Sequence, residues 1–190
     1  RFVLGRENTL EEIKLIRENT DKELEVFVHG ALCVAYSGQC FTSESIGGRS
    51  ANRGQCAQSC RLSYEMYVDG EKKELGNKRY LVSPQDLCGI EEAPELARIG
   101  VDSLKIEGRL KAPEYVASAA KSYSLKLQGL PYDPNQLALT YSRGFFTGWL
   151  HGVDHQKLVP ADHSSHRGLT LGEVEKVQGN IVSFSCDRKL

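Results

Sequence analysis

Hydrophobic and polar residues alternate most regularly in KELEVFVHG, residues 22–30. One face of an extended chain would carry Leu24, Val26 and Val28, and the other would carry Glu25, Phe27 and His29. This period of two predicts a β-strand. RFVLG, residues 1–5, is a second strand candidate, and residues 9–20 predict a helix because Thr9 and Glu12 have the spacing of a capping box.

Turn signals divide the middle of the chain. Asp69-Gly70 stands between two short strand-like runs and predicts a tight β-hairpin. A helix is expected to begin at Pro84, since Ser83 is a suitable cap and Asp86 would lie in the first turn.

Residues 101–109 alternate again, with Leu104 and Ile106 on the apolar face. A helix follows from Pro113 and ends at its cap, Gly129. Alternating strands and helices predict an α/β fold with a parallel sheet. Polar residues on one face of two strands favour the mouth of a βα barrel over an open doubly wound sheet, because both faces of the latter pack against helices.

These patterns predict three regions. Residues 1–129 form a partial, TIM-like βα barrel with a cysteine-rich insertion at 30–82. Residues 130–165 are rich in turns and predict a linker, and residues 166–190 predict the first strands of a small β domain. The chain opens directly on a strand, as a piece of a longer protein does.

Composition narrows the class of protein. The 190 residues carry a net charge of −1, and no apolar run approaches the length of a membrane span. A cytoplasmic protein is therefore expected, and a reducing compartment disfavours structural disulfides. Near-zero net charge argues against a broad coat of nucleic acid, although residues 49–79 hold seven Lys/Arg against four Asp/Glu.

The insertion contains four of the six cysteines: Cys33, Cys40, Cys56 and Cys60. Their C-x6-C and C-x3-C spacings differ from the C-x2-C knuckle of most structural zinc sites. An iron–sulfur cluster tolerates irregular spacing, so the pattern favours a cluster over zinc. A catalytic thiol paired with His29 is an alternative, while Cys88 and Cys186 fit small buried hydrophobes.

At residues 25–40, EVFVHGALCVAYSGQC, the chain resembles the peptidase U32 family, the collagenase-like peptidases. The resemblance covers nearly the whole chain, through RGQCAQSCR, LVSPQDLC, GVDSLKIEGRLKAPEYV, SRGFFTGWL and HRGLTLGEV. It implies the C-terminal half of a βα barrel, whose first half would precede Arg1, followed by a small β domain. It also implies either proteolysis or iron–sulfur-dependent hydroxylation of a pyrimidine in tRNA or rRNA, with an oxygen donor derived from prephenate.

The same resemblance assigns the thiols. Cys33, Cys40, Cys56 and Cys60 would hold a 4Fe-4S cluster, and Cys88 is the alternative to Cys60 as the fourth ligand.

Charged residues of the two alternating strands would lie near this cluster. Glu25 and His29 belong to the first strand, and Lys105, Glu107 and Arg109 to the end of the second. Lys105 and Arg109 would pair with an anionic donor or a phosphate, and Glu107 would orient a base or accept a proton. Lys105 and Glu107 could equally form an ordinary ion pair, and His29 could simply bond the loop backbone.

Other charged residues have weaker assignments. Arg49, Arg53 and Arg61 could contact RNA phosphates, although such runs are usually solvated surface. Four histidines of the turn-rich region are expected on the surface rather than around a metal: His151, His155, His163 and His166.

Hydroxylation is the favoured function because the peptidase alternative lacks recognisable machinery. The sequence has no G-x-S-x-G elbow and no H-E-x-x-H zinc helix. The expected partner is tRNA or rRNA that presents a flipped or single-stranded nucleotide. A collagenase-like protease is the first alternative, and a non-catalytic subunit that carries the cluster is the second.

Overall fold

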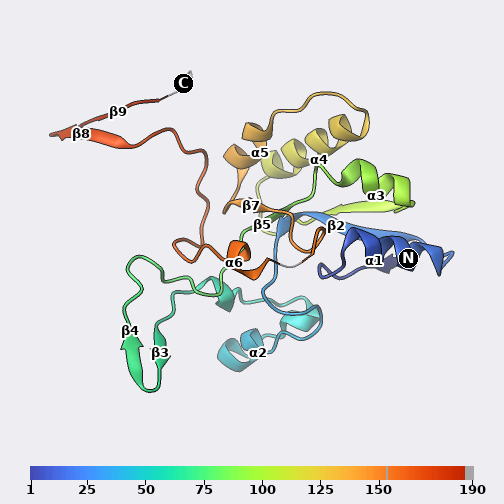
Figure 1. Ribbon diagram of the computed structural model, residues 1–190, viewed down its shortest axis with the longest axis horizontal. Coiled ribbons are helices and arrows are strands. Elements are labelled where there is room, and N and C mark those ends of the chain that lie inside the picture. The colour runs from blue at the N-terminus through green and yellow to red at the C-terminus, as the bar shows by residue number, and fades with distance from the viewer. Residues whose placement is uncertain (153, 187–190) are drawn as a thin grey trace.

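The structure is a computed structural model that describes residues 1–152 and 154–186 (Figure 1). Its helices are α1 (Leu10–Glu18), α2 (Thr42–Gly47), α3 (Ala93–Ile99), α4 (Pro113–Leu127), α5 (Pro134–Thr140) and α6 (His155–Leu158). Its strands are β1 (Phe2–Val3), β2 (Leu24–Ala31), β3 (Met66–Val68), β4 (Glu71–Lys73), β5 (Asp86–Cys88), β6 (Ser103–Ile106), β7 (Phe145–Phe146), β8 (Val174–Gln178) and β9 (Ile181–Phe184). The fold is mixed α/β.

Strand β2 is the centre of the main sheet. It pairs in parallel with β1 and with β6, where Val26 lies opposite Leu104. The sequence prediction of parallel pairing among these three strands is confirmed. Strand β5 adds an antiparallel pairing, with Gly30 opposite Leu87, and β7 extends the sheet parallel to β5. The described strands form an open sheet and do not close into a barrel.

The main core lies between this sheet and α1, α3 and α4. Its buried members include Ile13, Val28, Leu96 and Ala119, all at most 1% exposed. Helix α1 begins with the predicted capping box, in which the Glu12 amide donates to Thr9 Oγ1 and the Thr9 amide donates to Glu12 Oε2.

The predicted helix at Pro84 is wrong. Residues Asp86–Cys88 form β5, and the helix begins only at Ala93. Ser83 does not cap a helix, because its buried hydroxyl accepts a hydrogen bond from Arg61. Tertiary pairing overrides the local signal, because the Asp86 carboxylate is bound by a distant arginine and the strand is held against β2 and β7.

The interval 130–165, predicted as a linker, contributes to the main body. It contains α5, β7 and α6, and its Leu137, Leu150 and Leu158 are buried in the core. Aromatic and leucine side chains in this turn-rich sequence therefore pack on the sheet rather than connect two domains.

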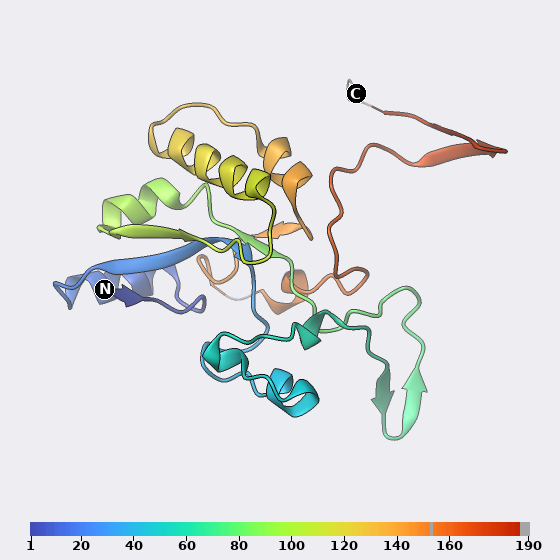
Figure 2. The same ribbon diagram turned by 180° about the vertical axis from the view of Figure 1, so that it is seen from behind.

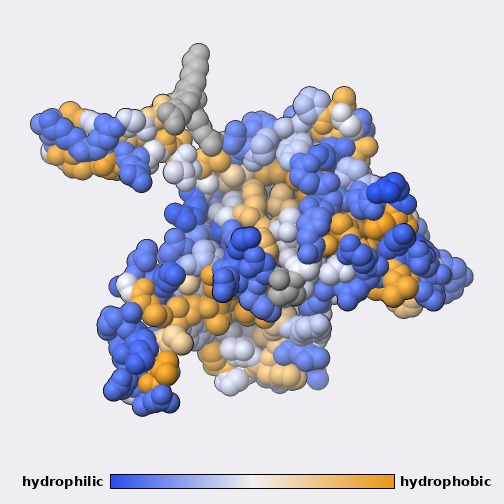
Figure 3. Space-filling view, in the orientation of Figure 1, coloured by the Kyte–Doolittle hydropathy of each residue, from blue (hydrophilic) through white to orange (hydrophobic). Residues whose placement is uncertain are grey.

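Two hairpins project from the body. The β3–β4 hairpin turns at the predicted dipeptide, where Asp69 and Gly70 have positive φ values of 53° and 82°. The β8–β9 hairpin confirms the strands expected after residue 166, and its residues are exposed. The space-filling view shows it standing clear of the body (Figure 3). No helix of the described residues is long and apolar enough to cross a bilayer.

The cysteine-rich part of the insertion, residues 33–61, is called here the cysteine lobe. It contains α2 and two short 3-10 turns, Ala51–Arg53 and Ser59–Arg61. Both ribbon views place α4 and α5 above the sheet and the cysteine lobe below it (Figures 1 and 2). The lobe is therefore displaced from the helical layer that covers the core.

The Asp86–Arg143 ion pair is expected to be a main support of this sheet, because both side chains are about 95% buried, at 5% and 4% exposed. Arg143 Nε donates to Asp86 Oδ1 at 3.1 Å, and the Arg143 amide donates to Oδ2 at 2.9 Å. Asp86→Ala should lower the free energy of unfolding by about 3–5 kcal/mol, since it leaves a buried guanidinium unpaired. Urea denaturation measures the loss.

The matched control is Arg98→Ala, which removes an ion pair whose arginine side chain is 77% exposed. It should cost no more than about 1 kcal/mol. Equal losses in the two variants would show that the buried pair has no special role.

Candidate functional site

The end of β2 crosses the segment after β6 at Gly30. Gly30 has a φ of +119°, and a Cβ there would lie 2.5 Å from the Glu107 carbonyl oxygen and 2.8 Å from the Glu107 Cβ. The Glu107 amide donates to the His29 carbonyl at 2.8 Å. Only glycine fits this crossing, so the backbone of Glu107 lies directly beside the chain that enters the cysteine lobe.

Backbone donors fix the Glu107 side chain. Its Oε1 accepts from the Arg109 amide at 2.9 Å, and its Oε2 accepts from the Ala31 amide at 3.4 Å. Tyr115 Oη donates to the Glu107 carbonyl at 3.2 Å. The result is a half-buried carboxylate with a set orientation at the entrance to the lobe.

The four lobe thiols influence one another. All are free; Cys33, Cys40 and Cys60 are half-buried, and Cys56 is exposed. Burial raises the pKa of Cys33, and charge on Cys40 and Cys56 raises it further. Burial likewise raises the pKa of Cys60, with added repulsion from Cys33 and Cys56. Four thiolates here would repel each other, so a shared cationic centre would stabilise them.

Short contacts organise the backbone around these thiols. The Cys40 amide donates to Asn52 Oδ1 at 3.0 Å, and the Ala57 amide donates to Ser43 Oγ at 3.2 Å. These contacts connect the first cysteine pair to the second. Nevertheless, no three His, Cys, Asp or Glu side chains of residues 1–152 and 154–186 converge on one point where a single metal ion would sit.

Cys88 lies elsewhere, on β5 opposite His29. Burial raises its pKa to about 11, and the side chains that most affect it are Tyr123, Glu92 and Glu91. The structure therefore groups Cys60, rather than Cys88, with the other lobe thiols.

Glu25 is bound at the opposite end of β2. It forms an ion pair with Lys105 and accepts hydrogen bonds from Ser103 Oγ at 3.1 Å and Arg1 Nη1 at 3.2 Å. The Lys105 contact, above all, lowers the pKa of Glu25. The ordinary ion pair considered between Lys105 and Glu107 is not formed, because Lys105 pairs with Glu25. About five residues of strand, roughly 16 Å, separate Glu25 from Gly30.

His29 is enclosed by aromatic rings. It is 1% exposed, and the ring centroids of Tyr115, Tyr123 and Phe145 each lie 5.6 Å from its own. Burial lowers its pKa to about 4, against a smaller opposing effect of Asp86. The imidazole is therefore neutral at pH 7 and has no open path to a substrate.

Arginines of the lobe divide into two kinds. Arg61 is a structural connection: it donates to Ser83 Oγ at 2.8 Å and to the Leu32 carbonyl at 3.1 Å. Arg49 and Arg53 are exposed on the lobe surface. Arg109, also exposed, donates to a backbone carbonyl of the lobe.

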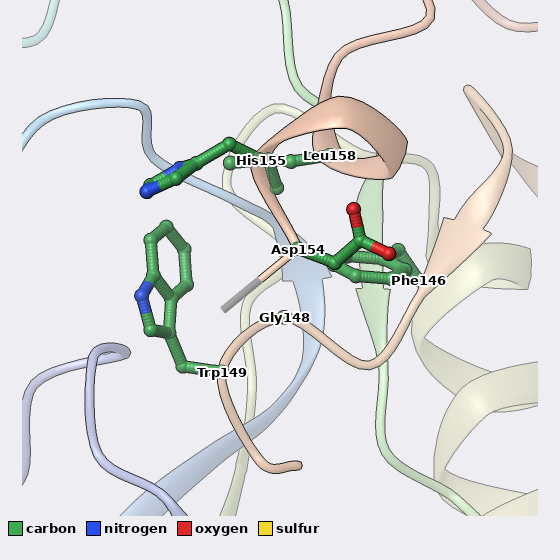
Figure 4. Close-up of a pocket in the computed structure, with 6 residues that line it drawn as sticks. All are labelled: Phe146, Gly148, Trp149, Asp154, His155 and Leu158. Atoms are coloured by element: carbon green, nitrogen blue, oxygen red, sulfur yellow. The ribbon is translucent and has the colours of Figure 1, made fainter. Parts of the chain in front are cut away.

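The histidines of the turn-rich region are held individually. His151 pairs with Glu92 at 2.7 Å, and His163 lies 2.8 Å from the Arg143 carbonyl. Figure 4 shows His155 facing Trp149 across a cleft that leaves no room for water. His151, His155 and His166 are exposed, whereas His163 is half-buried.

Comparison with known proteins identifies the family. The profile of peptidase family U32 matches residues 1–160. The chain belongs to this family. Its relatives include an uncharacterised protease of Methanocaldococcus jannaschii, 40% identical over 92% of this chain and 48% of the relative. No solved structure matches the chain.

Two further U32 relatives are named for RNA modification. The tRNA hydroxylation protein P1 of Bacillus subtilis is 40% identical over 81% of this chain and 36% of its own length. The 23S rRNA 5-hydroxycytidine synthase of Escherichia coli is 37% identical over 99% of this chain and 27% of its own length. The chain thus spans about a quarter to a half of the length of these three relatives.

Sequence reasoning missed three charged groups of this U32 chain: Arg6, the Asp86–Arg143 pair and the Glu25–Lys105 pair. Arg6 lies three residues after the end of β1, and polar residues that follow strands are a signal that could have identified it. No local pattern connects Asp86 to Arg143, because 57 residues separate them.

Replacing Gly30 tests the crossing. Gly30→Ala should lower the free energy of unfolding by more than about 2 kcal/mol, because it combines a positive φ with overlap against Glu107 backbone. Gly129→Ala is the control, since Gly129 also has a positive φ, +70°, but open space around it. Urea denaturation of both variants measures the difference. If the two variants lose equal stability, the close approach is not a constraint.

Acid should destabilise the protein through His29. The unfolded chain takes up this proton below about pH 6.5, whereas the folded chain does so only near a pKa of about 4. The contribution is therefore fully present above the unfolded value and is lost as the pH falls. Between pH 7 and pH 4.5 the loss should be about 2–3 kcal/mol.

His29→Phe should remove that part of the pH dependence, whereas His155→Gln, at an exposed histidine, should retain it. Urea unfolding at the two pH values measures both. An unchanged pH dependence in His29→Phe would contradict the buried neutral imidazole.

Proposed function

We propose that this U32 protein takes part in iron–sulfur-dependent hydroxylation of a pyrimidine base in tRNA or rRNA. The observation that carries the proposal is the grouping of four thiols on one lobe, which the chain enters at Gly30, against the backbone of Glu107. The names of the tRNA and rRNA hydroxylation relatives support the same chemistry. Another relative is named as a protease.

The donor set fits a cluster by its chemistry. Cys33, Cys40, Cys56 and Cys60 would hold a 4Fe-4S cluster, whose several irons accept thiolates that do not meet at one point. Such a cluster supplies one-electron chemistry to activate an oxygen donor, and a donor derived from prephenate remains part of the proposal. Binding would draw the lobe together and remove the repulsion among the thiolates.

Residues of the chain orient the substrate. Two backbone amides hold the Glu107 carboxylate, so it can accept a hydrogen bond from a base N–H without rearrangement. Arg109, exposed beside it, would meet an anionic group. Glu25 and Lys105 satisfy each other and support the sheet beneath. His29, closed among aromatic rings, positions the end of β2 rather than contacting the base.

The lobe surface suits single-stranded RNA. Arg49 and Arg53 are exposed there, and Tyr36 and Phe41 are each 66% exposed. Exposed aromatic rings stack with unpaired bases, and arginines between them neutralise phosphates. A flipped or single-stranded nucleotide is the substrate form that would reach Glu107. We also propose that the open sheet is part of a larger βα barrel, with its cysteine lobe at the mouth.

The protease alternative requires an ionised thiol beside an accessible imidazole. Burial raises the pKa of Cys33 and Cys60 and raises that of Cys88 to about 11. His29, the histidine considered as a partner, is closed off. These features favour hydroxylation over a thiol protease.

Iron analysis tests the proposal. Protein prepared anaerobically should contain about four irons and an equal amount of sulfide per chain. Its spectrum should show a broad absorption band at about 400 nm. Cys56→Ser should lose them, whereas Cys88→Ser, outside the lobe, should keep them. Mass spectrometry of nucleosides from incubated tRNA and rRNA should then detect a hydroxylated pyrimidine.

Each failure has a distinct meaning. Absence of iron, or iron that is indifferent to Cys56, would refute the cluster. Loss of iron in Cys88→Ser would move the fourth ligand to that residue. A cluster without any change in RNA would support the non-catalytic subunit instead.

A further inference from the structure

Arg6 lies in the turn between β1 and α1, at the same end of the sheet as the cysteine lobe. Its guanidinium carbon is 3.8 Å from the centroid of the Phe27 ring. Lys105 Nζ lies 5.3 Å from the same centroid. Phe27 on β2 is thus a platform with two cations, one of them stacked on it.

The guanidinium of Arg6 has no acceptor in the part of the chain that the structure describes. Among the residues that the structure describes, none accepts a hydrogen bond from Arg6 or forms an ion pair with it. The other half-buried or buried arginines, Arg17, Arg61 and Arg143, all donate to protein oxygens. None of its nitrogens is among the buried atoms of the described residues that lack a hydrogen-bond partner, so water reaches its donors and they are open to a ligand.

The surroundings define where that acceptor would lie. Burial lowers the pKa of Arg6, while charges on Glu107, Cys33 and Glu7 act in the opposite direction. These three groups are near enough to influence Arg6, yet none of them forms an ion pair or a hydrogen bond with it in the described part of the chain. The Glu7 carboxylate instead accepts from the Ser37 amide at 2.6 Å. A ligand held by Arg6 would therefore lie near the Glu107 carboxylate.

We infer that Arg6 anchors an oxyanion, a carboxylate or a phosphate, of a ligand that enters beside Cys33 and Glu107. The planar fork of a guanidinium matches two oxygens of either group, and stacking on Phe27 holds the fork in place. A hydrogen-bond donor on the same ligand would face Glu107. This inference rests on the proposed function, because it names the charged group by which the substrate or its oxygen donor is held.

Nuclear magnetic resonance of the ¹⁵N-labelled 190-residue chain, prepared without iron, tests the inference directly. The Nε–H signal of Arg6 should shift on addition of inorganic phosphate, uridine 5′-monophosphate or benzoate, and should not shift with uridine. Uridine 5′-monophosphate binding more tightly than benzoate indicates a nucleic-acid phosphate. The reverse order indicates a free carboxylate ligand.

Substitutions of Arg6 provide a second test, which compares the affinity of the chain for the anion. Arg6→Met should weaken binding of the preferred anion about tenfold or more, because a charge-assisted pair of hydrogen bonds is lost. Arg6→Lys, which retains the charge but not the fork, should fall between Arg6→Met and the unchanged chain. Arg98→Met, at the exposed arginine of α3, should bind as the unchanged chain does.

Two results would overturn the inference: an Arg6 signal indifferent to all three anions, or equal anion affinity in Arg6→Met and the unchanged chain. The signal of the unchanged chain decides the matter even if Arg6→Met fails to fold. Since the chain is iron-free throughout, a failure here is separate from a failure of the cluster. If Arg6 binds anions in a protein that never binds iron, the anion site is supported and the cluster is refuted.

Discussion

The crossing of two backbones at Gly30 and Glu107 is the constraint on which the site depends. A side chain at position 30 would overlap the Glu107 carbonyl, so the end of β2 and the segment after β6 are in direct contact only because this residue is glycine. The contact sets the point at which the chain leaves the sheet for the cysteine lobe. It also brings the Ala31 and Arg109 amides to the Glu107 carboxylate. Backbone geometry, rather than side-chain pairing, thus orients this carboxylate where the chain enters the lobe.

A second set of contacts, made by Arg61 beside a buried ion pair, holds the two ends of the lobe together. Arg61, at the end of the lobe, donates to the Leu32 carbonyl and to Ser83. Asp86, three residues after Ser83, is paired with Arg143. The entry and exit of the lobe are therefore held together by one arginine next to a buried ion pair. The four cysteines lie between these two points, in a segment whose ends are held by Arg61.

The parts of this arrangement that sequence could predict are the local ones. The strand at Leu24–Ala31 and the capping box at Thr9 depend on near neighbours, and both are confirmed. The polar face expected on that strand is nevertheless buried at Glu25 and His29. The strand at Asp86 could not be predicted from the sequence, because its partners on β2 and β7 lie more than fifty residues away in the chain. The Glu25–Lys105 pair was missed for the same reason: it depends on the register between β2 and β6. The cysteine positions predicted a shared lobe, but not the arginine that stacks beside it.

The four thiols of the lobe differ in solvent exposure, and they therefore differ in how readily they are oxidised in air. Cys56 is exposed, while the other three are half-buried and two of those have pKa values raised by burial. Reactive oxygen species attack accessible thiols first, and the early sulfenic product is reversible whereas the later acids are not. Damage to the lobe would therefore begin at a single residue. A brief exposure would oxidise one thiol that a reductant restores, and a long one would leave the lobe permanently without that thiol.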